Sequence, residues 1–240
     1  MEELTRYANE LLGLRISPAQ ITAFKTYENE LINWNQRFNL TAITDPVKIR
    51  IKHFLDSLTC ILAIRNSNQD RVVDVGSGAG FPGIPLKIVF PSMQLTLIES
   101  VGKKANFCRH MIALLGLINV EVMNERVEVV ATQDAYRQQY DWALARAVAP
   151  MPVLMEYLLP LVKIGGKALL MKGESGPIEA QESEYATHLM GGRLKQIIPV
   201  TLPGVEDQRY LITVEKIAAT PEQYPRKVGT PLKKPLIGKK

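Results

Sequence analysis

The sequence predicts an α/β fold in which a seven-stranded, mostly parallel sheet is covered by helices on both faces. Three observations predict it: a glycine-rich run directly after an apolar, β-branched segment, an alternation of strand-like and helix-like segments after Asp70, and a final pair of strands with no helix between them. The strands are expected near Val72 to Val75, Gln94 to Ile98, Asn119 to Met123, Trp142 to Ala145, Lys167 to Met171, Lys195 to Val200 and Arg209 to Lys216.

The connections between these strands distinguish parallel from antiparallel pairs. Only eight residues, Thr201 to Gln208, separate the last two strands. Because this connection is too short for a crossover helix, we predict an antiparallel hairpin, which a dinucleotide-binding sheet does not normally require. Between the second and third strands, Lys103 to Leu115 carries apolar side chains at helical spacing and is followed by Gly116. This segment is predicted to be a helix packed against the core.

The N-terminal part of the chain is predicted to be helical. Ser17 to Gln20 has the form of a capping box with proline at the first helical position, and a helix is expected from Pro18 to about Asn35. A further helix is expected from Val47 to Arg65, followed by a linker from Arg65 to Asp70. The predicted organisation is an N-terminal helical cap (1–68), a Rossmann-like domain (69–216) and a basic, proline-rich tail (217–240).

The composition is that of an ordinary globular protein of 240 residues, 46% of them hydrophobic, which is enough for a sizeable core. The chain has no continuous apolar run of membrane-spanning length and no cationic signal-peptide segment at its start, so we expect a cytoplasmic protein without membrane contact. Its two cysteines, Cys60 and Cys108, and three scattered histidines have no metal-ligand spacing. We therefore expect neither a disulfide framework nor a metal.

The net charge of +5 resides in the tail, because Ile217 to Lys240 contains six basic residues and one acidic residue. Four prolines prevent a continuous helix there, and the tail is expected to lie extended over the surface. An extended basic segment suits a phosphate backbone, although a solubilising, disordered terminus explains it equally well. The candidate RNA contacts in the tail are Arg226, Lys227, Lys233 and Lys234.

The glycine-rich run, Val72 to Pro85, predicts a cofactor site of nucleotide size. Gly76, Gly78 and Gly80 can bring bare backbone close to a ligand, and a helix starting near Phe81 or Pro82 would direct free N–H groups toward the same space. Ser77 lies within this loop. The second strand then presents Glu99, followed by Ser100, at its carboxyl end, where an acid can accept both hydroxyls of an adenosine ribose. This pattern fits S-adenosylmethionine and also NAD, so the run alone leaves both cofactors open.

Other candidate residues follow later strands of the predicted sheet. Arg146 ends the fourth strand, where it can bind a carboxylate, a phosphate or guanine O6, or simply pair with an acid at the sheet edge. Val127 and Glu128 follow the third strand. There Val127 could form an apolar wall for adenine and Glu128 a polar contact to it, or the two residues could simply begin a helix. Lys172 is a candidate phosphate contact if the substrate is nucleic acid. Outside the sheet, His53 and Asp56 would share one helix face, where helix-to-sheet hydrogen bonding is the favoured interpretation.

Motifs of other chemistries are missing from the chain. The sequence has no GxSxG, HExxH or P-loop pattern, no NPPY-type segment, and no cysteine beside a proline of the kind that attacks pyrimidines. Cys60 lies within the apolar run LTCILAI, so burial is expected. His188, the only late histidine, lies at no predicted strand end, which weakens the case for a dehydrogenase.

Seven segments occur along the chain in the order found in one bacterial family. They are NLTAI (Asn39 to Ile43), HFLDSL, DVGSGAGFPGIPL, LIESVGKKANF, ARAVAP, LLPLVKIGGKALLMKG and YPRKVGTPLKKPL. Together they resemble the glucose-inhibited division protein B family, the methyltransferases that make N7-methylguanine in the 530 loop of 16S ribosomal RNA. The likeness runs from about Asn39 to Gly173 and returns in the tail.

This resemblance implies a Rossmann-like, class I S-adenosylmethionine-dependent methyltransferase acting on 16S rRNA or the small ribosomal subunit, and we expect it to act as a monomer. It implies that Gly76 and Phe81 line the methyl-donor pocket, that Glu99 holds the ribose, that Val127 and Glu128 flank adenine, and that Arg146 serves cofactor or guanine. Two departures are that an aspartate often takes the place of Glu99 and that some members end before any such tail.

The expected chemistry fits the missing motifs. Guanine N7 carries an unprotonated lone pair at neutral pH, so methyl transfer needs positioning rather than a general base. The target base must be reached in a loop or splayed out of its stack. Two other functions remain open from the residues alone: a nicotinamide-dependent dehydrogenase, and a non-catalytic RNA-binding protein with a nucleotide pocket.

Overall fold

The computed structural model describes residues 1–64 and 70–238, which form a seven-stranded sheet of order β3-β2-β1-β4-β5-β7-β6. The strands β1 to β5 are parallel, and β7 is antiparallel to both of its neighbours. Most of the predicted linker, 65–69, lies outside the described residues, as do Lys239 and Lys240. The strands are β1 (Arg71–Val75), β2 (Gln94–Ile98), β3 (Val120–Met123), β4 (Tyr140–Arg146), β5 (Val162–Lys172), β6 (Gly192–Val200) and β7 (Arg209–Lys216).

All seven predicted strands are present, and the predicted hairpin is confirmed as the antiparallel pair β6 and β7. The strand β5 begins five residues earlier than predicted, because Val162 pairs with Tyr140 before a register shift brings Lys167 opposite Trp142. Gly165 and Gly166 lie within this irregular stretch, and glycines have no side chain to contribute to the apolar, β-branched pattern that marks a strand. Insertion of β7 between β5 and β6 is what turns the end of the sheet antiparallel.

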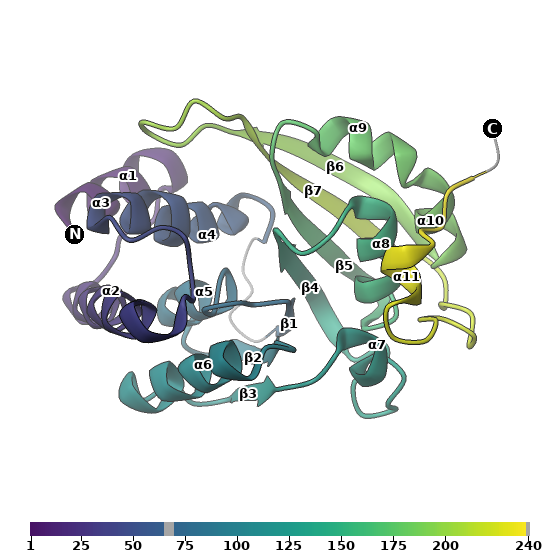
Figure 1. Cartoon of the computed structure of the whole chain (residues 1–240). Coiled ribbons are helices and arrows are strands. Elements are labelled where there is room, and N and C mark those ends of the chain that lie inside the picture. Colours follow the sequence, from purple (N-terminus) through teal and green to yellow (C-terminus); the bar gives the residue numbers. More distant parts are fainter. Residues whose placement is uncertain (65–69, 239–240) are drawn as a thin grey trace.

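Alternating side chains of the strands divide the interior into two cores. On one face, Val72, Leu97 and Leu144 pack with the N-terminal helices, α5 and α6. On the other face, Val73, Ala143 and their neighbours pack with the helices after β3 and β4. Figure 1 shows the N-terminal helices on one side of the sheet and α8 to α11 on the other. The helices from α5 onward are α5 (Gly83–Val89), α6 (Gly102–Leu114), α7 (Val127–Val130), α8 (Met151–Leu158), α9 (Gly176–Glu182), α10 (Glu184–Leu189) and α11 (Thr230–Lys233).

The N-terminal segment follows the sequence prediction in part. The helix α1 (Glu2–Leu12) was not among the predicted elements. The helix α2 (Pro18–Phe38) starts at the predicted capping box, with Ser17 Oγ accepting from Gln20 N, and it ends one turn beyond the predicted Asn35. Asn39, in the left-handed conformation, then ends it. Leu4, Phe24 and Leu31 are fully buried in the same cluster as the strand residues Val72, Leu97 and Leu144, so this segment shares the core of the strands.

The single helix predicted from Val47 to Arg65 is wrong in its regularity and its end. The chain is helical from Pro46 to Leu62 in four successive segments of three types: α3 (Pro46–Ile49), a π-helix η1 (Arg50–Leu55), α4 (Asp56–Leu58) and a 3₁₀-helix η2 (Thr59–Leu62). Hydrophobic spacing reports which face is buried, and it does not distinguish these hydrogen-bonding patterns. The π-helix widens the segment where it faces the sheet, a position at which such turns often accompany function.

Over its described residues, 217–238, the tail has no continuous helix, as predicted, and forms the single helical turn α11. It is packed more firmly than a chain lying over the surface, because Thr220, Pro225 and Pro231 are buried. The turn α11 packs against α8 (Figure 1). The division into cap, Rossmann-like domain and tail stays a prediction.

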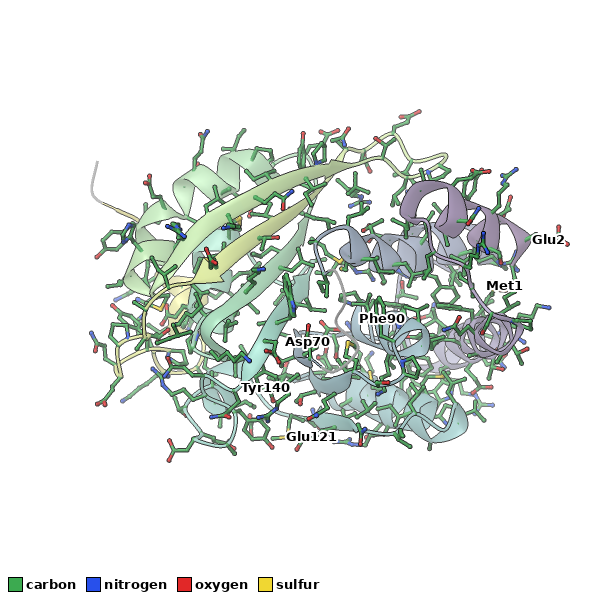
Figure 2. All side chains as sticks on the ribbon, turned by 180° about the vertical axis from the view of Figure 1, so that it is seen from behind. Met1, Glu2, Asp70, Phe90, Glu121 and Tyr140 are labelled. Atoms are coloured by element: carbon green, nitrogen blue, oxygen red, sulfur yellow. The ribbon has the colours of Figure 1, made fainter. Side chains whose placement is uncertain are left out.

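Two further features define the edges of the sheet. The loop between β6 and β7 extends over α1 and α3 (Figure 1), and its Leu202 and Val205 join the core that the N-terminal helices share. Figure 2 labels Asp70, Tyr140 and Glu121, which lie at the end of the sheet where the parallel strands β1, β4 and β3 begin. The glycine-rich loop therefore lies at the end of the sheet away from these residues.

We predict that Gly80→Ala destabilises the protein strongly. Gly80 has φ +94°, and an added Cβ would lie 2.7 Å from Tyr27 Oη and 2.5 Å from Ile84 Cδ1. Left-handed strain together with overpacking should cost about 3 kcal/mol of unfolding free energy, measured by urea denaturation. Gly13→Ala is the matched control, because Gly13 also has positive φ (+63°) and has open space around it. It should cost only about 1 kcal/mol. Equal losses for the two variants would contradict the predicted crowding at Gly80.

Candidate functional site

The glycine-rich loop after β1 is held in place by an acid from the neighbouring strand. Glu99, at the carboxyl end of β2, accepts hydrogen bonds from Gly78 N (2.7 Å) and from Val101 N (2.8 Å). Gly76 N donates to Ile98 O (2.8 Å) and continues the pairing of β1 with β2. Glu99 is buried, so its charge is stabilised by these directed N–H groups. The acid predicted to bind a ribose therefore also fixes the loop that precedes it in the chain.

A second buried acid stabilises the end of the same loop. Asp74, in β1, is fully buried, and its Oδ2 accepts from Gly83 N (2.8 Å), the first residue of α5. Burial raises the pKa of Asp74 to about 7, and the hydrogen bond from Gly83 opposes this shift. The loop from Gly76 to Pro82 is thus bounded by two carboxyl groups that hold its backbone.

Arg146 connects the end of β4 to the N-terminal segment. Its Nη1 donates to Asp56 Oδ2 (2.9 Å) and to the backbone oxygen of Lys52 (3.0 Å), and its Nη2 donates to His53 Nδ1 (3.2 Å). The guanidinium carbon also lies 5.1 Å from the centre of the Phe81 ring. The arginine is thereby oriented by four groups, three of them from the irregular helix that starts at Pro46.

His53 is neutral in this arrangement. The guanidinium of Arg146 can only donate, so His53 Nδ1 is an acceptor and the proton lies on Nε2, which donates to Thr41 Oγ1 (2.9 Å). Burial and then the charge of Arg146 lower the pKa of His53 to about 3. The imidazole also stacks on Phe81, with ring centres 4.5 Å apart. Both helix residues singled out in the sequence therefore contact the sheet, as favoured, through Arg146.

These residues surround a cavity of about 380 Å³ at the carboxyl edge of the sheet. The loop contributes Gly76, Ser77, Gly78 and Phe81, the sheet contributes Arg146 and Lys172, and the N-terminal segment contributes one whole wall. Its lining residues outside the backbone loop include Thr41, Lys52, His53, Asp56, Lys104, Arg146, Met171, Lys172, Arg209 and Tyr210. The cavity thus combines an apolar aromatic surface with charges of both signs.

Four of the predicted cofactor residues are not among those that line this cavity. Glu99 is behind the loop, Ser100 is exposed, and Val127 is packed into the core with Ile98. The carboxylate of Glu128 accepts from Gly229 N (2.9 Å) and from the Tyr157 hydroxyl (3.3 Å). Its side chain therefore faces α8 and the tail, and any contact of this residue with an adenine would have to come from its backbone.

The predicted RNA contacts fall into two groups. Lys172 Nζ donates to Glu179 (2.7 Å) and to Ala149 O (2.8 Å), and Arg226 forms a bidentate pair with Glu156. These two cations are engaged within the protein. The other three are exposed on the tail: Lys227, Lys233 and Lys234.

Sequence reasoning missed two cavity residues that a topological argument would have found. Arg209 and Tyr210 begin β7, and Tyr210 pairs with Lys172 at the end of β5. Because β7 runs antiparallel to β5, its first residues lie at the edge where the parallel strands end. The predicted hairpin already implied this placement. Thr41 and Lys52 had no comparable signal, because no sequence pattern predicts how the N-terminal segment docks.

The residues of this edge fit an adenosine-type methyl donor. Gly78 has φ +58°, lines the cavity, and would direct an added Cβ into open space, so a ligand can approach its backbone closely. Glu99 retains acceptor positions on a carboxylate, and Arg146 and Asp56 offer partners for a zwitterionic amino acid end.

The described residues contain no group of three or more potential metal-ligating side chains. No helix among them is long and apolar enough to cross a bilayer.

Solved structures of similar fold include methyltransferases. A SAM-dependent methyltransferase from Aquifex aeolicus superimposes with a TM-score of 0.53 and 18% identity, covering 71% of this chain and 93% of the other. A mutant of the 16S rRNA (adenine(1408)-N(1))-methyltransferase from Catenulisporales acidiphilia gives a TM-score of 0.52 at 13% identity, over 65% and 88% of the two chains. The sheet order with its inserted β7 is the Rossmann-like fold of class I methyltransferases.

Sequence comparison identifies the family. The family model for GidB, rRNA small subunit methyltransferase G, matches residues 20–209. Two of its relatives are named ribosomal RNA small subunit methyltransferase G. The one from Roseiflexus castenholzii is 47% identical to this chain, over 99% of this chain and 100% of its own length. The one from Alkaliphilus metalliredigens is 44% identical, over 94% of each chain. This chain belongs to that family, and the resemblance stated from its motifs is confirmed.

We predict that His53 remains unprotonated through the physiological pH range. In the native protein its imidazole shift, followed by NMR, should stay constant between about pH 8 and pH 5. The urea-unfolded protein is the control, since there each imidazole should titrate near its ordinary pKa. Native titration of His53 with a midpoint near pH 6.5 would contradict the assignment.

The same shift has a definite effect on stability. Because the folded pKa of about 3 is below the ordinary value of 6.5, the unfolded chain binds more protons between these values. The contribution of His53 to stability is therefore complete above pH 6.5 and is lost as the pH falls toward 3. Asp74 acts in the opposite direction, since its raised pKa adds stability at low pH that is lost between 3.8 and about 7.

Proposed function

We propose that this chain transfers a methyl group from S-adenosylmethionine to N7 of a guanine in the 530 loop of 16S rRNA. One structural observation supports the proposal in addition to family membership. Arg146 is held by Asp56 at the cavity wall, between the glycine-rich loop and the N-terminal segment. A cation fixed at this point can orient a donor on one side and a base on the other.

The donor, when bound, supplies an electrophilic methyl carbon attached to a positively charged sulfur. Gly76, Ser77, Gly78 and Phe81 would contact it from the loop. Glu99 would accept the ribose hydroxyls while keeping its backbone hydrogen bonds, with Ser100 next to it. Val127 and the backbone of Glu128 would flank adenine, which agrees with their position after β3.

The guanine would enter beside Arg146. A guanidinium can donate to guanine O6, which neighbours N7, and this contact would align the lone pair of N7 with the methyl carbon. The rings of neutral His53 and Phe81, which stack on each other, line the cavity and would form an apolar part of its wall beside the base. No residue has to remove a proton in this step, since the attacking nitrogen is already unprotonated. Arg146, Asp56 and His53 therefore act by position rather than by general acid or base catalysis.

The proposed partner is 16S rRNA, as the naked molecule or within the small subunit, with the protein acting in the cytoplasm as a monomer. Exposed Lys227, Lys233 and Lys234 are proposed to contact the phosphate backbone. Lys172 lines the cavity and already pairs with Glu179, so a phosphate would have to compete for it. Arg226 is the weakest of the predicted RNA contacts, because Glu156 takes up its guanidinium.

We predict label transfer from methyl-labelled S-adenosylmethionine to 16S rRNA, with the product mapped to N7 of a guanine in the 530 loop. Calorimetry should show binding of S-adenosylhomocysteine and no binding of NADH. Binding of NADH alone would favour the dehydrogenase. Retention of RNA without label transfer would favour the non-catalytic binding protein.

We predict that Arg146→Ala lowers kcat/KM by at least about 100-fold, because the loss of one orienting cation misplaces the reacting atoms. The variant leaves buried Asp56 without its ion pair, so Arg146→Ala with Asp56→Asn is needed to separate activity from stability. Circular dichroism checks the fold of both. Arg193→Ala is the matched control, since this exposed arginine of β6 pairs with Glu215 of β7, and it should keep full activity. Turnover of Arg146→Ala equal to that of the control would remove Arg146 from the site.

A further inference from the structure

The tail packs on the part of the protein that borders the adenine side of the proposed donor site. Glu156, on α8, is fully buried, and its carboxylate accepts from Arg226 N (2.7 Å), Nε (2.9 Å) and Nη2 (2.7 Å). A buried carboxylate with all these bonds to one residue depends on that residue for its charge compensation. Arg226 is therefore a fixed anchor of the tail.

A second contact joins the tail directly to α7. Glu128, the second residue of α7, is buried and accepts from Gly229 N (2.9 Å), three residues after Arg226. The Tyr157 hydroxyl, next to Glu156 on α8, donates to the same oxygen (3.3 Å). One carboxylate thus connects α7, α8 and the tail.

A third contact reaches the segment just after α7. The guanidinium of Arg137 donates to the backbone oxygens of Tyr224 (2.7 Å), Thr220 (3.0 Å) and Pro221 (3.2 Å). It also donates to Ala131 O (3.3 Å), at the end of α7. The tail from Thr220 to Gly229 is therefore bound to both ends of this short helix.

The helix α7 borders the carboxyl edge of the sheet on its other side. Its first residue, Val127, belongs to the same buried cluster as Ile98 and Val75, and Asn124, in the preceding loop, donates to Glu99 O (2.8 Å). A helix of four residues has little stability of its own. Its position must therefore be set by what packs around it.

From these contacts we infer that residues 220–236 form a strap that positions α7 for the methyl donor, with Arg226 as its positioning residue. The inference rests on the proposed function, because it assumes that Val127 and Glu128, at the start of α7, contact the adenine of the methyl donor. It assigns the tail two separate roles by residue: Arg226 and the Gly229 amide act on the donor site, and Lys233 and Lys234 act on RNA.

The test compares Arg226→Met with Lys233→Ala/Lys234→Ala in the full-length chain. We expect Arg226→Met to weaken S-adenosylhomocysteine binding by about fivefold and to raise KM for the donor with little change in kcat, because fewer molecules hold α7 in the competent position. Its RNA affinity should keep the salt dependence of the wild type. The lysine variant should show the reverse: unchanged donor affinity and a flatter salt dependence.

Two additional measurements keep the test decisive. If Arg226→Met does not fold, Arg226→Lys retains a charge opposite Glu156 and should weaken donor binding by about twofold. Hydrogen exchange should then accelerate at the amides of α7 and not in β1 or β2. Wild-type donor affinity in a folded Arg226 variant, whatever its Tm, would overturn the strap. Failure of the wild type itself to bind S-adenosylhomocysteine would instead overturn the proposed function.

Discussion

The site depends on the contact between Arg146 and the N-terminal segment. The end of β4 offers a single guanidinium, and Asp56, His53 and the Lys52 carbonyl satisfy it from a helix that is irregular where they lie. Without this contact the glycine-rich loop would lie uncovered at the carboxyl edge of the sheet. With it, the loop faces a wall of the N-terminal segment, and the cavity between them has an oriented cation, a neutral imidazole and a buried aromatic ring.

Charge compensation by distant segments recurs across the molecule. Asp56 pairs with Arg146 over 90 residues of sequence, Glu156 pairs with Arg226 over 70, and Glu128 accepts from Gly229 over 101. In each case a buried carboxylate is satisfied by a residue far away in the chain: Asp56 of the N-terminal segment by Arg146 of β4, and Glu156 and Glu128 by the C-terminal tail. The two appended segments therefore complete opposite sides of the sheet edge, one at the proposed guanine position and the other at the proposed adenine position.

The sequence was a good guide wherever a local pattern had a direct structural meaning. Apolar, β-branched segments that alternate with helical ones located all seven strands, and the eight-residue connection identified the antiparallel hairpin. The capping box at Ser17 marked the start of α2. The predictions were weaker where conformation depends on packing, as in the π-helix within Pro46–Leu62. The side chain of Glu128 shows the same limit, because its sequence neighbours give no sign that it contacts Gly229.

The sequence by itself determined the class of fold, the glycine-rich loop with its acid Glu99, and the family, because these are recorded in spacing and local residue types. Only the tertiary structure decided which charges remain available to a ligand. Arg226 and Lys233 are equivalent cations in the sequence, yet one is paired with a buried carboxylate and the other is exposed. The physical reason is that the partner of a charged side chain decides whether that charge is available to a ligand. Partners far apart in the sequence meet only when the chain folds.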